Sequence, residues 1–322
     1  MRRRLACLLA LCLLAALLGG CGAGEARGSA VPSVVVTVFP LWDWTRTVAG
    51  EEAGGPRLSL LLDNGVDMHS YQPSVEDMTA ILTCDLLIYV GGESDAWVED
   101  ALANAQNPDM VVLNLMEVLG DAARMEETVE GMQGGEEEPE YDEHIWLSLR
   151  NARTCCTAIA GALAQINPSR GAEYAANAAA YARQLSKLDA EYQNAVGTAL
   201  ARSDRLHDTL LFADRFPFRY LLDDYGLRYY AAFSGCEAET EASFETVTFL
   251  AKKVDELGLG AVLTTESPVP RLAETVVENT AGQTAKILAL DSMQSVTAAQ
   301  IAGGEGYLEI MERNLEVLKE AL

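Results

Sequence analysis

Short apolar runs alternate with amphipathic stretches along most of the chain. Val34 to Val38 is a continuous β-branched run, typical of a strand buried in a parallel sheet, and Leu41 to Val48 then has a helical pattern. The alternation continues, with further strands expected at 58–62, 86–90, 110–113, 209–213, 227–233, 261–265 and 286–290. This pattern predicts an α/β fold with two doubly wound lobes.

One long apolar stripe with a helical period separates the two halves. Its members are Tyr174, Ala178, Tyr181, Leu185, Leu188, Tyr192, Val196 and Leu200. A helix of this length spans roughly 40 Å, the width of a domain. We therefore expect an N-terminal lobe over 34–167, a linking helix over 168–202 and a C-terminal lobe over 203–322. Such a helix would act as a spine that limits hinge motion between the lobes.

The first twenty residues have the features of an export signal. Arg2, Arg3 and Arg4 precede an apolar run from Leu5 to Leu18, whose helix would be only about 21 Å long and therefore too short to cross a membrane. The run ends in Leu-Gly-Gly before Cys21, which resembles a bacterial lipoprotein signal. That resemblance implies cleavage after residue 20, lipid on Cys21 and a flexible tether over 21–33. A plain signal peptide is the alternative.

Charge and cysteine content narrow the functional classes. The formal net charge is −25, and it becomes −28 if residues 1–20, with their three arginines, are removed. Such an acidic protein is not expected to bind nucleic acid. The remaining cysteines, Cys84, Cys155, Cys156 and Cys236, contain no CxxC pair that would suggest a zinc finger. No disulfide pairing can be assigned from their spacing.

Residues 120–143 interrupt the alternating pattern. The segment is rich in glutamate and glycine, with few apolar side chains to bury, so we expect it to be mobile. A solvated charge run is the simpler interpretation. Because it directly precedes His144, a weak cation collector near a binding site is the second interpretation.

Two of the three histidines stand out. His69 lies in Asp67-Met68-His69-Ser70-Tyr71, His144 follows Asp142-Glu143, and both segments are predicted to be loops. Imidazole is a common ligand of transition metals and a nearby carboxylate can orient it, so we predict that both bind one metal ion. The third histidine, His207, lies in a charged stretch and is interpreted as a surface residue.

Acidic residues close to predicted strand ends supply further candidates. Asp214, Glu266 and Asp291 each follow an expected strand, and ligands of open α/β sheets bind beyond the carboxyl ends of strands. Each also has a structural interpretation: Asp214 as a helix cap, and Glu266 and Asp291 as turn caps. Two imidazoles with carboxylates would suit Zn²⁺ or, with more ligands, Mn²⁺.

Several segments together resemble the solute-binding proteins of zinc and manganese ABC importers that have a rigid helical linker. They are Val38-Phe39-Pro40-Leu41, Gly65 to Pro73, Asp85 to Gly92, Asp142 to Ser148, Tyr225-Gly226-Leu227, Glu266-Ser267 and Leu290 to Met293. The resemblance runs from about residue 34 to the C-terminus. It implies metal capture in a cleft between the lobes and delivery to a membrane permease with its ATPase. The acidic segment resembles the ligand-rich loop of zinc members.

The resemblance also implies a ligand set. The family's first two histidines correspond to His69 and His144, and its late aspartate corresponds to Asp291. Its third ligand position falls on Arg215 without a gap, or on Asp214 with one inserted residue, and we choose Asp214. Cys236 and Glu239, in the following loop, and Glu266 are held in reserve. The carboxylates favour manganese and the acidic segment favours zinc; zinc is our prediction.

Competing functions use the same residue types. An exported metallohydrolase would need an open metal position and a general base, and no HExxH, Gly-x-Ser-x-Gly or P-loop sequence occurs. A metal-stabilised adhesin is the third possibility. We predict a non-enzymatic, monomeric, extracytoplasmic protein that is held at the cell membrane by lipid on Cys21.

Overall fold

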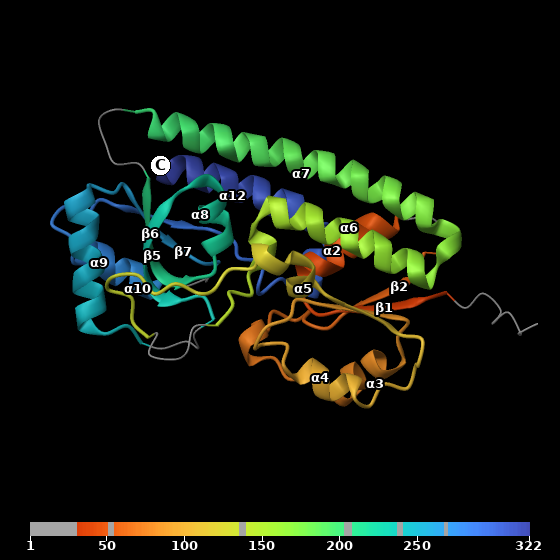
Figure 1. Ribbon diagram of the computed structural model, residues 1–322. Helices are drawn as coiled ribbons and strands as arrows, with labels where there is room; N and C mark the ends of the chain where they lie inside the picture. The colour runs from red at the N-terminus through yellow and green to blue at the C-terminus, as the bar shows by residue number, and fades with distance from the viewer. Residues whose placement is uncertain (1–30, 51–54, 135–139, 203–207, 237–240, 267–269) are drawn as a thin grey trace, which may run out of the picture. The chain divides into compact units, whose positions relative to one another are not determined.

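Four parallel strands form the sheet of the first lobe, in the order β2-β1-β3-β4 (Figure 1). They are β1 (Ser33–Val36), β2 (Arg57–Leu60), β3 (Leu86–Tyr89) and β4 (Val111–Asn114). Val34 pairs with Leu58 on one side and Leu86 on the other, so β1 is a central strand. Its β-branched run is buried on both faces, as expected for a parallel sheet covered by helices.

The second lobe repeats this topology in the order β6-β5-β7-β8, again with all strands parallel. Its strands are β5 (Thr209–Phe216), β6 (Arg228–Ser234), β7 (Ala261–Thr264) and β8 (Lys286–Ala289). The predicted fold class, two doubly wound lobes joined by a long helix, is confirmed. The predicted end of β5 was wrong: the strand does not end at Ala213 but continues to Phe216. Its pairing with β6 shifts register between Phe212 and Arg215 and then resumes.

Helices surround both sheets. In the first part of the chain they are α2 (Phe39–Ala49), α3 (Val75–Thr83), α4 (Trp97–Leu102), α5 (Leu115–Leu119) and α6 (Leu149–Ile166). In the second they are α7 (Gly171–Leu200), α8 (Arg219–Tyr225), α9 (Phe244–Leu257), α10 (Arg271–Glu278), α11 (Ala298–Ala302) and α12 (Tyr307–Ala321). Short 3-10 turns are η1 (Met68–Ser70), η2 (Gly120–Ala122), η3 (Ile145–Leu147) and η4 (Pro168–Arg170). Ser74 caps α3 through a capping box with Asp77.

The long helix α7 has 30 residues and lies against α6, α2 and α12 (Figure 1). Its buried face is the predicted stripe except at the last turn, where Ala199 is buried and Leu200 is 44 % exposed. Tyr192 from this face donates a hydrogen bond to the Met311 carbonyl of α12 and stacks on Tyr225 of α8. The helix therefore contacts elements from both halves of the chain.

A shared core joins the two lobes near α12. Tyr307, at the start of α12, is fully buried; its hydroxyl donates to the Trp146 carbonyl and its ring packs edge-on against Trp44. Its backbone N–H donates to Asp43 of α2. Apolar residues of both sheets, α6, α7 and α12 belong to one cluster, and a smaller cluster lies under α9 and α10. The lobes are thus connected by continuous packing as well as by α7.

The acidic segment contacts the second lobe over its described residues. Gln133 forms a parallel bridge to Phe233 and accepts a hydrogen bond from the Ser243 N–H. Arg124 donates its N–H to Tyr220, and a Cβ on Gly131 would overlap the ring of Phe249, so glycine permits the close contact there. These contacts cover the edge strand β6. The predicted mobility of 120–143 stays a prediction.

The computed structural model describes residues 31–50, 55–134, 140–202, 208–236, 241–266 and 270–322. The predicted signal peptide, most of the tether and Cys21 lie outside them, as does Glu239. Within these ranges, no helix has the length and apolar character needed to cross a membrane. Cys84, Cys155, Cys156 and Cys236 all have free thiols.

Candidate metal-binding site

His69 is positioned by the turn that follows β2. Asp67 caps η1 by accepting the His69 backbone N–H at 3.0 Å. The ring nitrogen Nδ1 lies 2.8 Å from Ser94 Oγ, and Glu143 Oε1 accepts the Ser94 N–H at 2.8 Å. Gly92, with φ of 89°, leaves room for the Glu143 side chain, which a Cβ there would meet at 2.4 Å. These contacts direct His69 Nε2 away from its own turn.

His144 is fully buried at the start of η3. Asp142 Oδ1 accepts both its backbone N–H at 2.8 Å and its ring Nδ1–H at 2.9 Å. The Asp142 carbonyl in turn accepts the hydroxyl of Tyr220, which fixes the loop from the second lobe. Because the carboxylate accepts the proton on Nδ1, it fixes the tautomer in which Nε2 carries no proton. The lone pair of Nε2 is then free to bind a metal, as in metal-ligating histidines.

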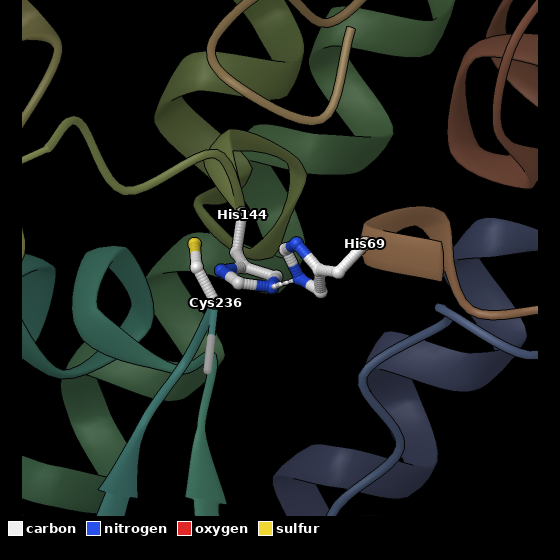
Figure 2. A group of neighbouring side chains, drawn as sticks. All are labelled: His69, His144 and Cys236. Atoms are coloured by element: carbon white, nitrogen blue, oxygen red, sulfur yellow. Dashed lines mark hydrogen bonds between the residues drawn. The ribbon is translucent and has the colours of Figure 1, made fainter. Parts of the chain in front are cut away.

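The two Nε2 atoms face each other at 3.3 Å (Figure 2). A zinc ion about 2.0–2.1 Å from two nitrogens in tetrahedral geometry would hold them roughly 3.3–3.4 Å apart. The side-chain amide of Gln294 lies 2.8 Å from Nε2 of His144 and 3.2 Å from Nε2 of His69. Its NH₂ can donate to both lone pairs, and after rotation its oxygen would face the same point. The pair therefore has the spacing that one bound zinc ion requires.

Cys236 is the third member of the group. Among the described His, Cys, Asp and Glu side chains, His69, His144 and Cys236 form the one set whose ligand atoms all lie within 4.8 Å of one another (Figure 2). Gly235 permits this approach, since a Cβ on it would come 2.9 Å from His144 Cε1 and from the Phe216 carbonyl oxygen. Burial and the neighbouring carboxylates Glu126 and Asp142 raise the pKa of the Cys236 thiol.

The two histidines titrate differently. Burial, and then the neighbouring His144, lower the pKa of His69 to about 3. Burial alone would lower the pKa of His144 too, but the Asp142 carboxylate outweighs it and raises this pKa above the ordinary 6.5. The pair therefore takes up its first proton on His144. Burial also raises the pKa of Glu143, whose Oε2 is buried without a hydrogen-bond partner 3.8 Å from His69 Nδ1.

The structure does not bring the predicted carboxylate ligands into this group. Asp214 lies within β5, where Oδ2 accepts the Thr265 N–H and hydroxyl at 3.0 and 2.8 Å. Asp291 follows β8 and accepts the Met293 N–H at 2.8 Å; burial and Glu266 raise its pKa to about 6. Glu266 accepts hydrogen bonds from Ser292 and Ser295. Their role as ligands stays a prediction.

Sequence reasoning missed Gln294 and the role of Arg215. Gln294 lies three residues beyond Asp291, and its only signal was that position after a strand. Arg215 is the residue on which the sequence count without a gap falls, and its guanidinium donates to Asp67 Oδ2 at 2.6 Å. Burial raises the pKa of Asp67, but Arg215 outweighs it and lowers this pKa. The guanidinium is thus held in an ion pair with the first lobe, beside the turn that carries His69.

A cleft of about 730 Å³, lined mostly by residues of the second lobe, lies beside the two histidines. It lies at the carboxyl ends of β5, β7 and β8 and reaches Gln294, which touches both histidines. Its walls are formed by Gly65, Asp67, Ala213, Asp214, Arg215, Phe233, Glu241, Ala242, Val247, Thr265, Glu266, Pro270, Arg271, Leu272, Thr275, Ser292, Gln294 and Ser295. This is the edge at which open α/β sheets bind ligands.

Fold and site together define a two-lobed α/β protein of the solute-binding type, with two facing histidines beside the cleft. The chain matches the family "Zinc-uptake complex component A periplasmic" over residues 34–321, and it belongs to that family. The resemblance inferred from the sequence is therefore confirmed.

Individual relatives agree with this assignment. Zinc-binding protein AdcA of Streptococcus pyogenes serotype M6 is 26 % identical over 298 residues, covering 89 % of this chain and 55 % of that protein. High-affinity zinc uptake system protein ZnuA of Bacillus subtilis is 24 % identical and covers 98 % of this chain and 96 % of that protein. The chain spans about half the length of the AdcA relatives that it matches.

The solved structures give the same fold. Zn(II)-bound AdcA of Streptococcus pneumoniae superposes with a TM-score of 0.72 at 26 % identity, covering 91 % of this chain and 58 % of that one. The periplasmic zinc-binding protein TroA of Treponema pallidum has a TM-score of 0.71 at 20 % identity and covers 91 % of this chain and 99 % of that one, a likeness of fold.

Proposed function

We propose that this protein captures Zn²⁺ outside the cytoplasm and delivers it to the permease of an ABC importer. One observation carries the proposal: the Nε2 atoms of His69 and His144 face each other at 3.3 Å, the separation that a tetrahedral zinc ion requires. Membership of a zinc-uptake family supports the same function.

The proposed ligands are His69, His144, Cys236 and the Gln294 side-chain oxygen. The first lobe supplies both imidazoles, already oriented by Ser94 and Asp142. The second lobe supplies the thiol and the amide. Zinc would take the position at which the Gln294 NH₂ now donates to the two nitrogens, so binding requires rotation of that amide and loss of the Cys236 thiol proton.

The chemistry of this donor set favours zinc over manganese. Imidazole and thiolate are the ligands that zinc prefers, whereas manganese favours carboxylate, carbonyl and water. Among the described residues, no carboxylate belongs to the group of ligand atoms within 4.8 Å. The manganese alternative depends on Asp214 and Asp291 leaving the hydrogen bonds that they now accept.

Partners and location follow from the family. Delivery requires a membrane permease and its ATPase, and lipid on Cys21 would hold the protein at the membrane surface, consistent with a relative named zinc-binding lipoprotein AdcA in Streptococcus pneumoniae. The family is a binding component of an uptake complex, which favours a non-enzymatic role for this chain as well.

Metal titration tests the proposal. The purified protein should bind one Zn²⁺ reversibly and at least about 100-fold more tightly than Mn²⁺, given the ligand types. Substitution by Co²⁺ should produce a thiolate-to-cobalt charge-transfer band that Cys236→Ser abolishes. Preference for manganese would support the alternative ligand set, and failure to bind either ion would overturn the proposed function.

A further inference from the structure

The cleft beside the histidine pair is much larger than a metal ion needs. Its volume of about 730 Å³ falls within the range of small-molecule pockets, about 300–1,000 Å³. Because Gln294 forms part of its wall and also contacts both histidines, a molecule in the cleft would lie next to the bound metal.

The charge at the metal position is incomplete without a further ligand. His69, His144 and the Gln294 amide are neutral donors, and Cys236 is the one described side chain of the group that can supply a negative charge. The neighbouring carboxylates do not supply a second one directly: Asp142 and Glu143 face the Nδ1 atoms of the histidines, and Asp67 is paired with Arg215. A divalent cation bound at the Nε2 atoms would therefore gain from an anionic ligand of external origin.

Arg215 is placed to receive such an anion. Its side chain is 16 % exposed and lines the cleft, and among the described residues its one hydrogen-bond acceptor is Asp67, bound through Nη2. A guanidinium carries five N–H donors, so others can pair with a second carboxylate. Arg271 adds another cation to the same wall.

Most acidic side chains in the wall of the cleft already form an ion pair or accept hydrogen bonds from protein groups. Asp67 pairs with Arg215, Asp214 accepts from Thr265, and Glu266 accepts from Ser292 and Ser295. Glu241 is the remaining acid and is exposed. The hydroxyls of Thr265, Thr275 and Ser295 add polar surface that suits a hydroxylated or amino-bearing carboxylate.

We infer that the cleft takes zinc together with a small anionic chelator, of the hydroxycarboxylate or amino-acid class, whose carboxylate pairs with Arg215 and replaces the neutral Gln294 oxygen as the fourth zinc ligand. This inference rests on the proposed function and names the form in which zinc is captured.

The test compares zinc binding with and without citrate or L-histidine. Affinity is calculated against free Zn²⁺, so that chelation in solution is accounted for, and native mass spectrometry detects a protein–zinc–chelator complex. At least one of the two compounds should raise the affinity for free Zn²⁺ about 10-fold or more and form a 1:1:1 complex, an effect of the size that a charge-assisted bidentate contact provides.

Variants locate the effect. Arg215→Gln should bind zinc alone but reduce the chelator enhancement to about 2-fold or less, on the same reasoning. Arg228→Gln is the matched control, because Arg228 begins β6, pairs with Asp208 and does not line the cleft. If Arg215→Gln does not fold, as judged by its melting curve, Arg271→Gln should show a smaller loss of the same enhancement.

The outcomes separate the two proposals. Zinc binding that is unchanged by either chelator, without a ternary complex, would overturn the co-ligand and leave zinc capture intact. An enhancement that survives in Arg215→Gln would overturn the role of the arginine. Absence of zinc binding under all conditions would overturn the proposed function itself.

Discussion

The two lobes equip the metal site in different ways. In the first lobe, both imidazole rings are oriented by a neighbouring side chain. Ser94 contacts Nδ1 of His69, and Asp142 accepts the proton on Nδ1 of His144. In the second lobe, the carboxylates expected to bind metal already accept hydrogen bonds within their own lobe, and an amide and a thiol approach the histidines instead. One half is preformed, and the other half must adjust when metal binds.

This difference explains how the site would tolerate an unusual second lobe. Ligands whose orientation is fixed in advance lose little side-chain entropy on binding, so the histidine pair would supply most of the affinity. The second lobe can then vary its donors without abolishing capture. The predictions below test this division, from the largest effect to the smallest.

Removal of a first-lobe ligand should have the largest effect. His144→Ala should weaken zinc binding by more than about 100-fold, because loss of a mere orienting partner already costs about 10–100-fold. Competition with a chromophoric chelator measures the change, and melting curves check that the buried site remains folded.

The double variant His69→Ala/His144→Ala is the control for this prediction. Since both residues would bind one ion, the wild type should bind a single Zn²⁺ and the double variant should bind no more tightly than either single variant. Two zinc ions in the wild type, with one lost in each single variant, would contradict a shared ion, and unchanged affinity in His144→Ala would remove the paired-histidine site altogether.

Removal of an orienting group should rank second. Asp142→Asn keeps the size of the side chain but removes the charge that fixes the His144 tautomer, so zinc affinity should fall by about 10–100-fold. Asp121→Asn is the matched control, an exposed acid in η2 of the same acidic segment. Equal effects of both variants would mean that the segment acts through its total charge, as a cation collector.

The pH dependence should reflect one histidine and not two. The raised pKa of His144 means that zinc must displace its proton, so below that pKa the histidine lowers the affinity by about 10-fold for each unit of falling pH, in addition to the constant contribution of the Cys236 thiol. His69, with its pKa lowered to about 3, holds no proton to displace at pH 5.

Calorimetry in buffers of different ionisation enthalpy counts the protons released on binding. Release at pH 5.5 should exceed release at pH 8.5 by about one proton, the one from His144, since a coordinating Cys236 thiol would contribute equally at both. A difference of two would show that both imidazoles are protonated in the metal-free protein.

The difference between the two lobes also determines which parts of the site could be predicted from the sequence. The two histidines of the first lobe could be predicted because each has a carboxylate partner in its own short segment: Asp67 accepts the backbone N–H of His69, and Asp142 accepts the ring N–H of His144. Ser94, which contacts the His69 ring, lies 25 residues away and was not predicted. The α/β alternation and the α7 stripe were accessible for a similar reason, since both are local periodicities. Such features depend on neighbours along the chain.

The part of the proposed metal site that lies in the second lobe depends on long-range contacts, which a local sequence pattern cannot predict. The irregularity between Phe212 and Arg215 extends β5 and decides which side chains face the cleft, and nothing in the run Thr209 to Ala213 indicates it. Gln294 reaches the histidines because the chain after β8 is tied to the first lobe, where the Trp146 indole donates to the Ser292 carbonyl. Such long-range packing leaves no periodic trace in the sequence.

The smallest effects are expected for the second lobe's carboxylates. Asp291→Asn and Asp214→Asn should each change zinc affinity by less than about 2-fold, because both side chains already accept backbone N–H bonds and an asparagine oxygen can continue to do so. Zinc competition assays on both variants measure this, with Asp121→Asn again as the control. A loss of about 10-fold or more for Asp291→Asn would show that its carboxylate leaves the Met293 N–H and turns to the metal, as the family resemblance implies. In that case the second lobe would supply a charged ligand by rearranging when zinc binds. The zinc affinity would then depend both on the preoriented histidines of the first lobe and on this rearrangement of the second.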